Sequence, residues 1–226
     1  MKYSIQNFVK SRPKTKIVCT IGPASGDIDS LKKLIKSGMS VARLNLSHGT
    51  QSEHFQYVEN ARKASKDLLT PLAILIDVPG PKYRVGKIDK GSVELIKGQK
   101  ILISDETIFK GRILEKIKVW PQGIYKDSST NSTIFLDDGA IKLKIINKRN
   151  KEIQCSVLNS GILKSNKSVT IPGSVSSLDY FTDETIKSLR FAKKINSTFV
   201  GLSFIRDATD VKKVRRWYSK NNFNTQ

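Results

Sequence analysis

The sequence is poor in cysteine and in long apolar runs. Its 226 residues include only two cysteines, Cys19 and Cys155, which lie far apart in strand-like segments. We therefore expect two buried free thiols in a reducing compartment rather than a disulfide or a metal pair. No apolar run approaches the ~20 residues that span a bilayer, and the segment 1–16 lacks the apolar stretch of a signal peptide. These absences predict a cytoplasmic protein with no membrane segment.

Acidic residues are also scarce. The 20 Asp and Glu stand against 40 Lys and Arg, which gives a formal net charge of +20. Such an excess can mark a nucleic-acid-binding protein. The lysines are scattered, however, and the densest groups, at 147–152 and 212–218, are short and lack the alternating aromatic residues of single-strand-binding proteins. We expect no nucleic-acid partner, because a lysine-rich bias or the lack of an acidic half explains the charge as well.

The two ends of the chain alternate between strand-like and helix-like segments. Four apolar runs predict buried strands, and amphipathic segments after them predict helices; the strands are expected at 16–21, 41–46, 72–78 and 197–205. Strands that are apolar on both faces are typical of a parallel sheet or barrel covered by helices. We predict four β/α units, half of a (β/α)8 TIM barrel, formed by residues 1–84 and 171–226. Half a barrel would leave two open strand edges and an apolar inner face.

Residues 85–170 follow a different pattern. Short alternating segments are separated by turn signals such as Lys97 and Gly98, or Asp138 and Gly139. This pattern predicts a small antiparallel β domain inserted after the third strand of the α/β domain. The predicted fold class is therefore α/β, with an all-β insertion.

Polar side chains follow the predicted strands at their carboxyl ends, where β/α barrels carry their active sites. The four strand ends supply Pro23 and Ser25; Arg43, Asn45, Ser47 and His48; Asp77, Lys82 and Arg84; and Ser203 and Arg206. Basic side chains around one rim suit a substrate with phosphate or carboxylate groups. Asparagine, serine and aspartate oxygens suit Na⁺, K⁺ or Mg²⁺.

Each residue also has a purely structural interpretation. Arg43 could be a buried structural charge whose partner is Asp77 on the neighbouring strand. His48 could be a turn residue, Asp77 a turn cap, and Asp137 with Asp138 an ordinary hairpin turn. Polar groups from four separate strand ends favour a functional site over these separate explanations.

Six segments, in order and at suitable spacing, resemble the pyruvate kinase family. They read RPKTKIVCTIGPAS, GMSVARLNLSHGT, IDVPGPKYRVG, FLDDG, SVTIPG and LSFIRDATDV, and they run from about residue 12 to 222. The resemblance implies the N-terminal half of the family's fold: the first half of a TIM barrel with a β-barrel lid domain inserted after strand 3. It also implies phosphoryl transfer from phosphoenolpyruvate to ADP in glycolysis, giving pyruvate and ATP. The family uses Mg²⁺ and usually K⁺, and its full-length members form homotetramers.

The resemblance assigns roles by position. Arg43 corresponds to the arginine that binds the substrate phosphate. The ligands of the monovalent cation correspond to Asn45, Ser47, Asp77 and the backbone carbonyl of Val78. Positions linked to nucleotide phosphates correspond to His48, Arg84 and Lys167, and a lid aspartate that approaches the site on closure corresponds to Asp138. These roles suit phosphoryl transfer, which depends on positioning and on neutralising phosphate charge.

Two features depart from the family pattern. Lys82 stands where the family usually has glutamate. A lysine here accompanies independence from K⁺ in some branches, and we hypothesise that its ammonium replaces the ion. The family's catalytic lysine and Mg²⁺-binding acids fall after residue 226, so we identify no catalytic residue in this chain. We expect a truncated copy of an active enzyme; the alternatives are one piece of a split enzyme, and a non-catalytic nucleotide- or anion-binding relic or basic interaction protein.

Overall fold

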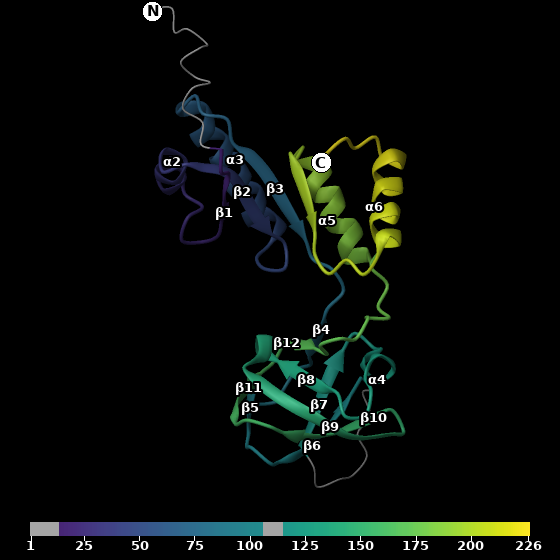
Figure 1. The fold of residues 1–226 in the computed structure, drawn as a ribbon. Helices are drawn as coiled ribbons and strands as arrows, with labels where there is room; N and C mark the ends of the chain where they lie inside the picture. The colour runs from purple at the N-terminus through teal and green to yellow at the C-terminus, as the bar shows by residue number, and fades with distance from the viewer. Residues whose placement is uncertain (1–13, 106–114) are drawn as a thin grey trace, which may run out of the picture. The chain divides into compact units, whose positions relative to one another are not determined.

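Figure 1 shows the computed structural model, which describes residues 14–105 and 115–226. The chain divides into two compact units, one formed by residues 1–80 and 181–226 and the other by residues 81–180. We call them the α/β unit and the inserted unit. The signal-peptide argument concerns residues 1–16, of which 1–13 lie outside the described residues.

The α/β unit is a four-stranded parallel sheet with helices between its strands. Its elements are β1 (Ile17–Thr20), α2 (Ile28–Lys36), β2 (Met39–Asn45), α3 (Gln51–Asp67), β3 (Ala73–Val78), α5 (Asp183–Lys194), β13 (Phe199–Leu202) and α6 (Ala208–Lys220). The strands lie in the order β1-β2-β3-β13, and each neighbouring pair is parallel. The prediction of four β/α units is confirmed.

Each of the four helices begins at a capping side chain that the sequence contains. The N-cap residues are Asp27 for α2, Thr50 for α3, Thr182 for α5 and Asp207 for α6. Their side-chain oxygens accept hydrogen bonds from backbone N–H groups that the first helical turn leaves unpaired. Gly38 follows the end of α2 with a φ of +105°, a conformation that glycine adopts without steric cost.

Only one face of the sheet is covered by these helices. Ala42, Leu44 and Ile76 are buried, and α2 and α5 contact β2 and β3. The prediction of a buried first strand is wrong, because Ile17 and Val18 in β1 are 44% and 51% exposed. In the described part of the chain β1 lies at the edge of the sheet and pairs with β2 alone, so no strand covers its other edge.

The last predicted strand is also less buried than expected. All four residues of β13 are half-buried, although this strand follows the apolar pattern of a buried one. Its outer edge bonds to the backbone of Gln226, since Val200 N donates to Gln226 O at 2.7 Å and Gln226 N donates to Thr198 O at 3.4 Å. The exposed inner face of the sheet agrees with the expectation for half a barrel. The outer edge of β13, which was expected to be open, is partly paired.

The inserted unit is a closed β-barrel of seven strands with a separate two-stranded sheet. Its elements are β4 (Tyr83–Val85), β5 (Ser92–Leu95), β6 (Lys100–Ser104), β7 (Glu115–Trp120), α4 (Ile124–Asp127), β8 (Thr133–Leu136), the 3-10 turn η1 (Asp137–Gly139), β9 (Ile141–Arg149), β10 (Glu152–Val157), β11 (Gly161–Lys164) and β12 (Ser168–Thr170). The barrel order is β10-β6-β7-β4-β12-β8-β9, and β11 pairs with β5. Alternate residues such as Ile101, Ile103 and Ile117 fill the interior. The barrel is not wholly antiparallel as predicted, because β6 and β7 run parallel.

Both cysteines are free. Cys155 is buried in the inserted unit, and this burial raises the pKa of its thiol to about 12. Cys19 is half-buried rather than buried as expected, because it lies on the edge strand β1. Among the helices of the described ranges, none is long and apolar enough to cross a membrane.

Candidate functional site

The carboxyl ends of the four parallel strands lie along one edge of the sheet and carry a group of polar side chains. The register pairs Thr20 with Arg43, Asn45 with Asp77, and Asp77 with Gly201. Because directly paired residues of neighbouring strands point to the same side of a sheet, Thr20, Arg43, Asn45 and Asp77 share one face. This is the face that the helices leave uncovered.

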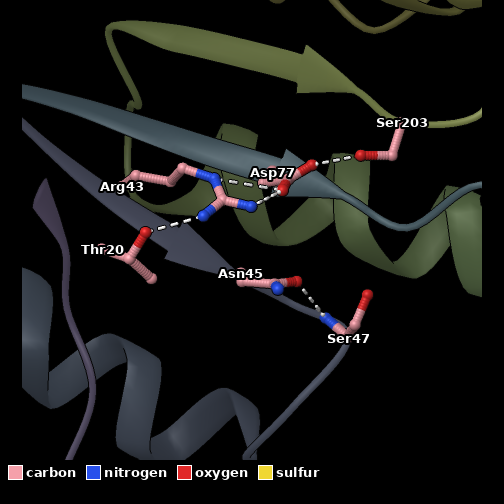
Figure 2. A network of polar contacts seen from close by, with 6 residues as sticks. All are labelled: Thr20, Arg43, Asn45, Ser47, Asp77 and Ser203. Atoms are coloured by element: carbon pink, nitrogen blue, oxygen red, sulfur yellow. Dashed lines mark hydrogen bonds and ion pairs between the residues drawn. The ribbon is translucent and has the colours of Figure 1, made fainter. Parts of the chain in front are cut away.

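Arg43 is the centre of a hydrogen-bonded network on this face, as Figure 2 shows. Its Nη2 and Nε donate to Asp77 Oδ2 at 2.5 and 3.2 Å, and its Nη1 donates to Thr20 Oγ1 at 2.6 Å. The Arg43 side chain remains 34% exposed, whereas that of Asp77 is 12% exposed. The carboxylate therefore anchors the guanidinium group, part of which is still accessible to a ligand. The expected partnership of Arg43 and Asp77 is confirmed.

The second oxygen of Asp77 is held from the other side. Ser203, which directly follows β13, donates from Oγ to Asp77 Oδ1 at 2.7 Å and from its backbone N to Val78 O at 3.2 Å. Gly80 makes this approach possible, because a Cβ added there would lie 2.1 Å from Ser203 O. The two ends of β3 and β13 are thus locked together, and the orientation of the Asp77 carboxylate is set from both sides (Figure 2).

Asn45 ends β2, and Ser47 and His48 lie in the tight turn that follows it. Asn45 Oδ1 accepts a hydrogen bond from Ser47 N at 3.0 Å, and Asn45 O accepts one from His48 N at 3.4 Å. An asparagine side chain that bonds the backbone two residues ahead stabilises such a turn. His48 is exposed, and the Ser47 side chain is half-buried.

The oxygens at this edge suit a monovalent cation. Asn45, Ser47 and Asp77 offer side-chain oxygens, and Val78 offers its backbone carbonyl, which are the hard ligands that alkali cations prefer. Asn45 Oδ1 accepts a hydrogen bond from Ser47 N, Val78 O accepts one from Ser203 N, and each oxygen has a second lone pair. By ligand type the donor set therefore fits the cation that the family resemblance implies, while both carboxylate oxygens of Asp77 already accept hydrogen bonds from Arg43 and Ser203. Within residues 14–105 and 115–226, no three His, Cys, Asp or Glu side chains form a group that could hold a metal ion.

The inserted unit brings together a second group of predicted residues. Lys82 Nζ lies 3.7 Å from Asp138 Oδ1, and Lys167 Nζ lies 2.9 Å from Asp137 Oδ1. Ser168 Oγ donates to Asp138 Oδ1 at 2.6 Å and accepts from Asp138 N at 2.8 Å. The Ser168 hydrogen bond, together with Lys82 and Lys167, holds the pKa of Asp138 below its usual range.

This acidic turn connects β8 and β9, as its turn signal predicted. Asp137 and Asp138 both have positive φ values, 51° and 52°, which aspartate tolerates better than most residues. Arg84 in β4 donates from Nη1 to Asn166 O at 3.1 Å, and its backbone partner in β12 is Ser168. Three predicted basic residues, Lys82, Arg84 and Lys167, therefore belong to the β4 and β12 side of the barrel.

Sequence reasoning missed some of these contacts. Thr20 was not among the candidates, and Ser203 was noted only as a strand end. Their roles depend on the register of β1 and β13, for which the sequence contains no signal. Two other rim candidates serve local structure: Ser25 Oγ accepts from Gly22 N at 3.2 Å, and Arg206 bonds the buried carboxylate of Asp210.

Comparisons with known proteins point to one family. The family described as pyruvate kinase, barrel domain, matches residues 12–226. A pyruvate kinase of Staphylococcus saprophyticus is 43% identical over 205 residues, which are 90% of this chain and 35% of that protein. A pyruvate kinase of Staphylococcus aureus is 41% identical over 204 residues, 89% of this chain and 34% of that protein. The chain thus spans about a third of the length of the curated relatives it matches.

A solved structure is also similar. The crystal structure of a pyruvate kinase from Cryptosporidium parvum has a TM-score of 0.85 and 34% sequence identity. It covers 92% of this chain, and the similar region is 43% of the solved chain. The likeness includes both the parallel β/α units and the inserted barrel.

Proposed function

The chain belongs to the pyruvate kinase family, and from this membership we propose that it forms the part of an enzyme that binds phosphoenolpyruvate and ADP for phosphoryl transfer. The products of that reaction are pyruvate and ATP. The reaction belongs to the whole family enzyme, of which the matched segment is about a third. Its place would be the last step of glycolysis, in the cytoplasm, and in a homotetramer when the polypeptide is complete.

The anchored guanidinium of Arg43 is the observation that carries the proposal. Three hydrogen bonds to Asp77 and Thr20 hold it on the open face of the sheet, at the carboxyl ends of the strands. A preoriented guanidinium binds a phosphate more strongly than a mobile one, because less side-chain freedom is lost on binding. Arg43 is proposed to bind the phosphate of phosphoenolpyruvate, while Asp77 and Thr20 keep its orientation.

The neighbouring oxygens are proposed to correspond to the family's site for a monovalent cation. Asn45, Ser47, Asp77 and the Val78 carbonyl would be its ligands, and the bound ion would supply positive charge beside the substrate phosphate. We propose that the ammonium group of Lys82 supplies this charge in place of K⁺. Support comes from the residue itself, since Lys82 stands where the corresponding motif of the family usually has glutamate.

The nucleotide is proposed to interact with His48, Arg84 and Lys167, with Asp138 as a residue of the inserted unit that approaches the substrate on closure. Basic side chains neutralise phosphate oxygens, and closure excludes water from the reaction. No residue of this chain is proposed to hold the family's Mg²⁺, because residues 14–105 and 115–226 contain no cluster of three His, Cys, Asp or Glu side chains that could bind a metal ion.

A second candidate is a basic, non-catalytic anion-binding protein. The net charge of +20 favours it, because such a charge attracts polyanions whatever the arrangement of individual side chains. This binding would depend on total charge and on salt concentration. It would not depend on any single arginine.

Calorimetric titration with phosphoenolpyruvate and with ADP separates the two candidates. The variant R43Q is expected to raise the dissociation constant of phosphoenolpyruvate by about tenfold to a hundredfold, since it removes charge-assisted hydrogen bonds. The matched control is K36Q, which removes one exposed positive charge on α2. Equal small losses in both variants would support the polyanion-binding candidate. A folded chain that binds neither ligand would contradict the proposed function.

A further inference from the structure

The chain has two histidines, and the proposed function gives a role to only one of them. His48 lies exposed in the turn after β2, where it is a candidate for nucleotide binding. His54 lies on the first turns of α3 and is only 6% exposed. Burial of a histidine costs free energy unless its ring nitrogens form hydrogen bonds with the protein, because these nitrogens lose their contact with water.

His54 contacts the turn that carries His48. Its Nε2 lies 2.6 Å from the backbone oxygen of His48. A carbonyl oxygen can only accept, so Nε2 carries the proton and donates it. The ring lies edge-on to Tyr57 and tilted against Phe191, with centroid distances of 6.1 and 6.5 Å. The imidazole is therefore fixed by packing from α3 and α5, and it points its N–H group at the turn.

The other ring nitrogen indicates which tautomer this arrangement needs. Nδ1 of His54 is buried and has no hydrogen-bond partner in the part of the chain that the structure describes. A proton on Nδ1 would be a buried donor without an acceptor, which costs more than an unprotonated nitrogen in the same place. The contact with His48 therefore favours the tautomer of the His54 ring whose single proton is on Nε2.

The rest of the turn is anchored in the same way. Thr50 caps α3, and Glu53 Oε2 accepts from Thr50 N at 2.7 Å. Gly49, between His48 and Thr50, has a φ of +74°, and a Cβ added there would lie 3.3 Å from Glu53 Oε2 and 3.4 Å from His54 Nε2. The turn therefore lies closely against the start of α3. The His54 hydrogen bond reaches the carbonyl oxygen of His48 itself.

We propose that His54 is a positioning residue that holds the His48 turn in the conformation in which it binds the nucleotide. This proposal rests on the proposed function for its ligand, ADP. It concerns a residue that need not touch the nucleotide. Through the His48 carbonyl, His54 limits the directions in which the His48 imidazole can point, and preorganisation of this kind strengthens binding.

Nuclear magnetic resonance tests the hydrogen bond in the unmodified chain. A two-bond ¹H–¹⁵N spectrum is expected to show His54 as the neutral tautomer with the proton on Nε2. The backbone amide of Thr50 and the signals of His48 report the order of the turn. The proton on Nδ1, or a rapidly averaging pair of tautomers, would overturn the proposal without any substitution.

Two substitutions test the consequence for binding. H54L removes the donor, and H54Q retains an N–H group that can reach the same carbonyl. H54L is expected to weaken ADP binding about fivefold, the effect of one hydrogen bond. H54Q is expected to restore the affinity to within about twofold of the unmodified chain. The control I35V, on α2, makes a comparable small core change away from the turn.

The outcomes separate this proposal from the function on which it rests. If the unmodified chain does not bind ADP, the proposed function fails, while the tautomer and the order of the turn still decide the role of His54. If the chain binds ADP and H54L binds it equally well, the positioning role is wrong. A loss of affinity in I35V as large as in H54L would likewise overturn it, because the effect would then come from general destabilisation.

Discussion

Arg43 Nη2 lies 2.5 Å from Asp77 Oδ2, and this contact joins two neighbouring strands through residues 34 positions apart in the chain. Ser203, a further 126 positions from Asp77, holds the other carboxylate oxygen. The same network therefore stabilises the sheet edge and orients the group that is proposed to bind phosphate. Structural and functional interpretations of Arg43 do not exclude one another.

Replacement of Asp77 by asparagine tests how much this network stabilises the α/β unit. D77N removes the charge that pairs with Arg43, and hydrogen bonds to charged groups contribute about 1.5–3 kcal/mol. We expect the free energy of unfolding, measured with urea, to fall by about 2 kcal/mol. The control E59Q weakens an exposed pair with Arg62, at 3.5 Å, and is expected to change stability by less than about 0.5 kcal/mol. Equal effects of the two variants would contradict this account.

Gly80 tests the close approach of β3 and β13. Its backbone leaves room for Ser203, and an alanine Cβ at this place would lie 2.1 Å from the Ser203 carbonyl oxygen. Since the neighbour is backbone, G80A forces the two strand ends apart, and we expect a loss of about 1–3 kcal/mol in unfolding free energy. The control G22A adds a methyl group where nothing lies within 4 Å. Urea unfolding of both variants measures the difference, and a G80A protein as stable as G22A would show that the approach is unimportant.

Asp210 predicts a pH dependence of stability. Its side chain is 1% exposed and accepts hydrogen bonds from the guanidinium of Arg206 at 2.8 and 3.0 Å, which lowers the pKa of the carboxyl group. Because the folded pKa is depressed, the stabilisation is complete above the unfolded pKa of about 3.9 and is lost as the pH falls through the folded pKa. We expect D210N to be about 2–4 kcal/mol less stable than the unmodified chain at pH 7. The difference should shrink at pH values below about 4.

Urea unfolding at a series of pH values measures this difference. D207N is the control on the same helix, because asparagine caps a helix about as well as aspartate. A difference between D210N and the unmodified chain that is independent of pH would contradict the titration of Asp210 as its cause.

Lys82 predicts how substrate binding depends on K⁺. If its ammonium supplies the charge of the ion, the affinity of the chain for phosphoenolpyruvate should be similar in K⁺ and in tetramethylammonium at constant ionic strength. K82E introduces the glutamate usual in the family, and its affinity should be at least about tenfold higher with K⁺ than without it. The exposed control K87E makes the same charge change in the inserted unit. A requirement for K⁺ in the unmodified chain would disprove the replacement.

Much of the fold could be predicted because the responsible signals are local. The apolar runs predicted the strands of the α/β unit, and the amphipathic segments after them predicted its helices. The turn at Asp137 and Asp138 was also predicted from neighbouring residues. The predicted burial of β1 was wrong because burial depends on what covers a strand, and a run such as that of Ile17 and Val18 does not contain this information.

The candidate site divides in the same way. Residue type and the period of a strand place Arg43, Asn45 and Asp77 on neighbouring strand ends, and the motifs around them identify the family. The partners of these side chains come from distant segments: Thr20 reaches Arg43 through the register of β1, and Ser203 reaches Asp77 through that of β13. Register is a property of paired strands. The sequence by itself therefore determined which groups are available, whereas the tertiary structure decided which oxygen each donor meets.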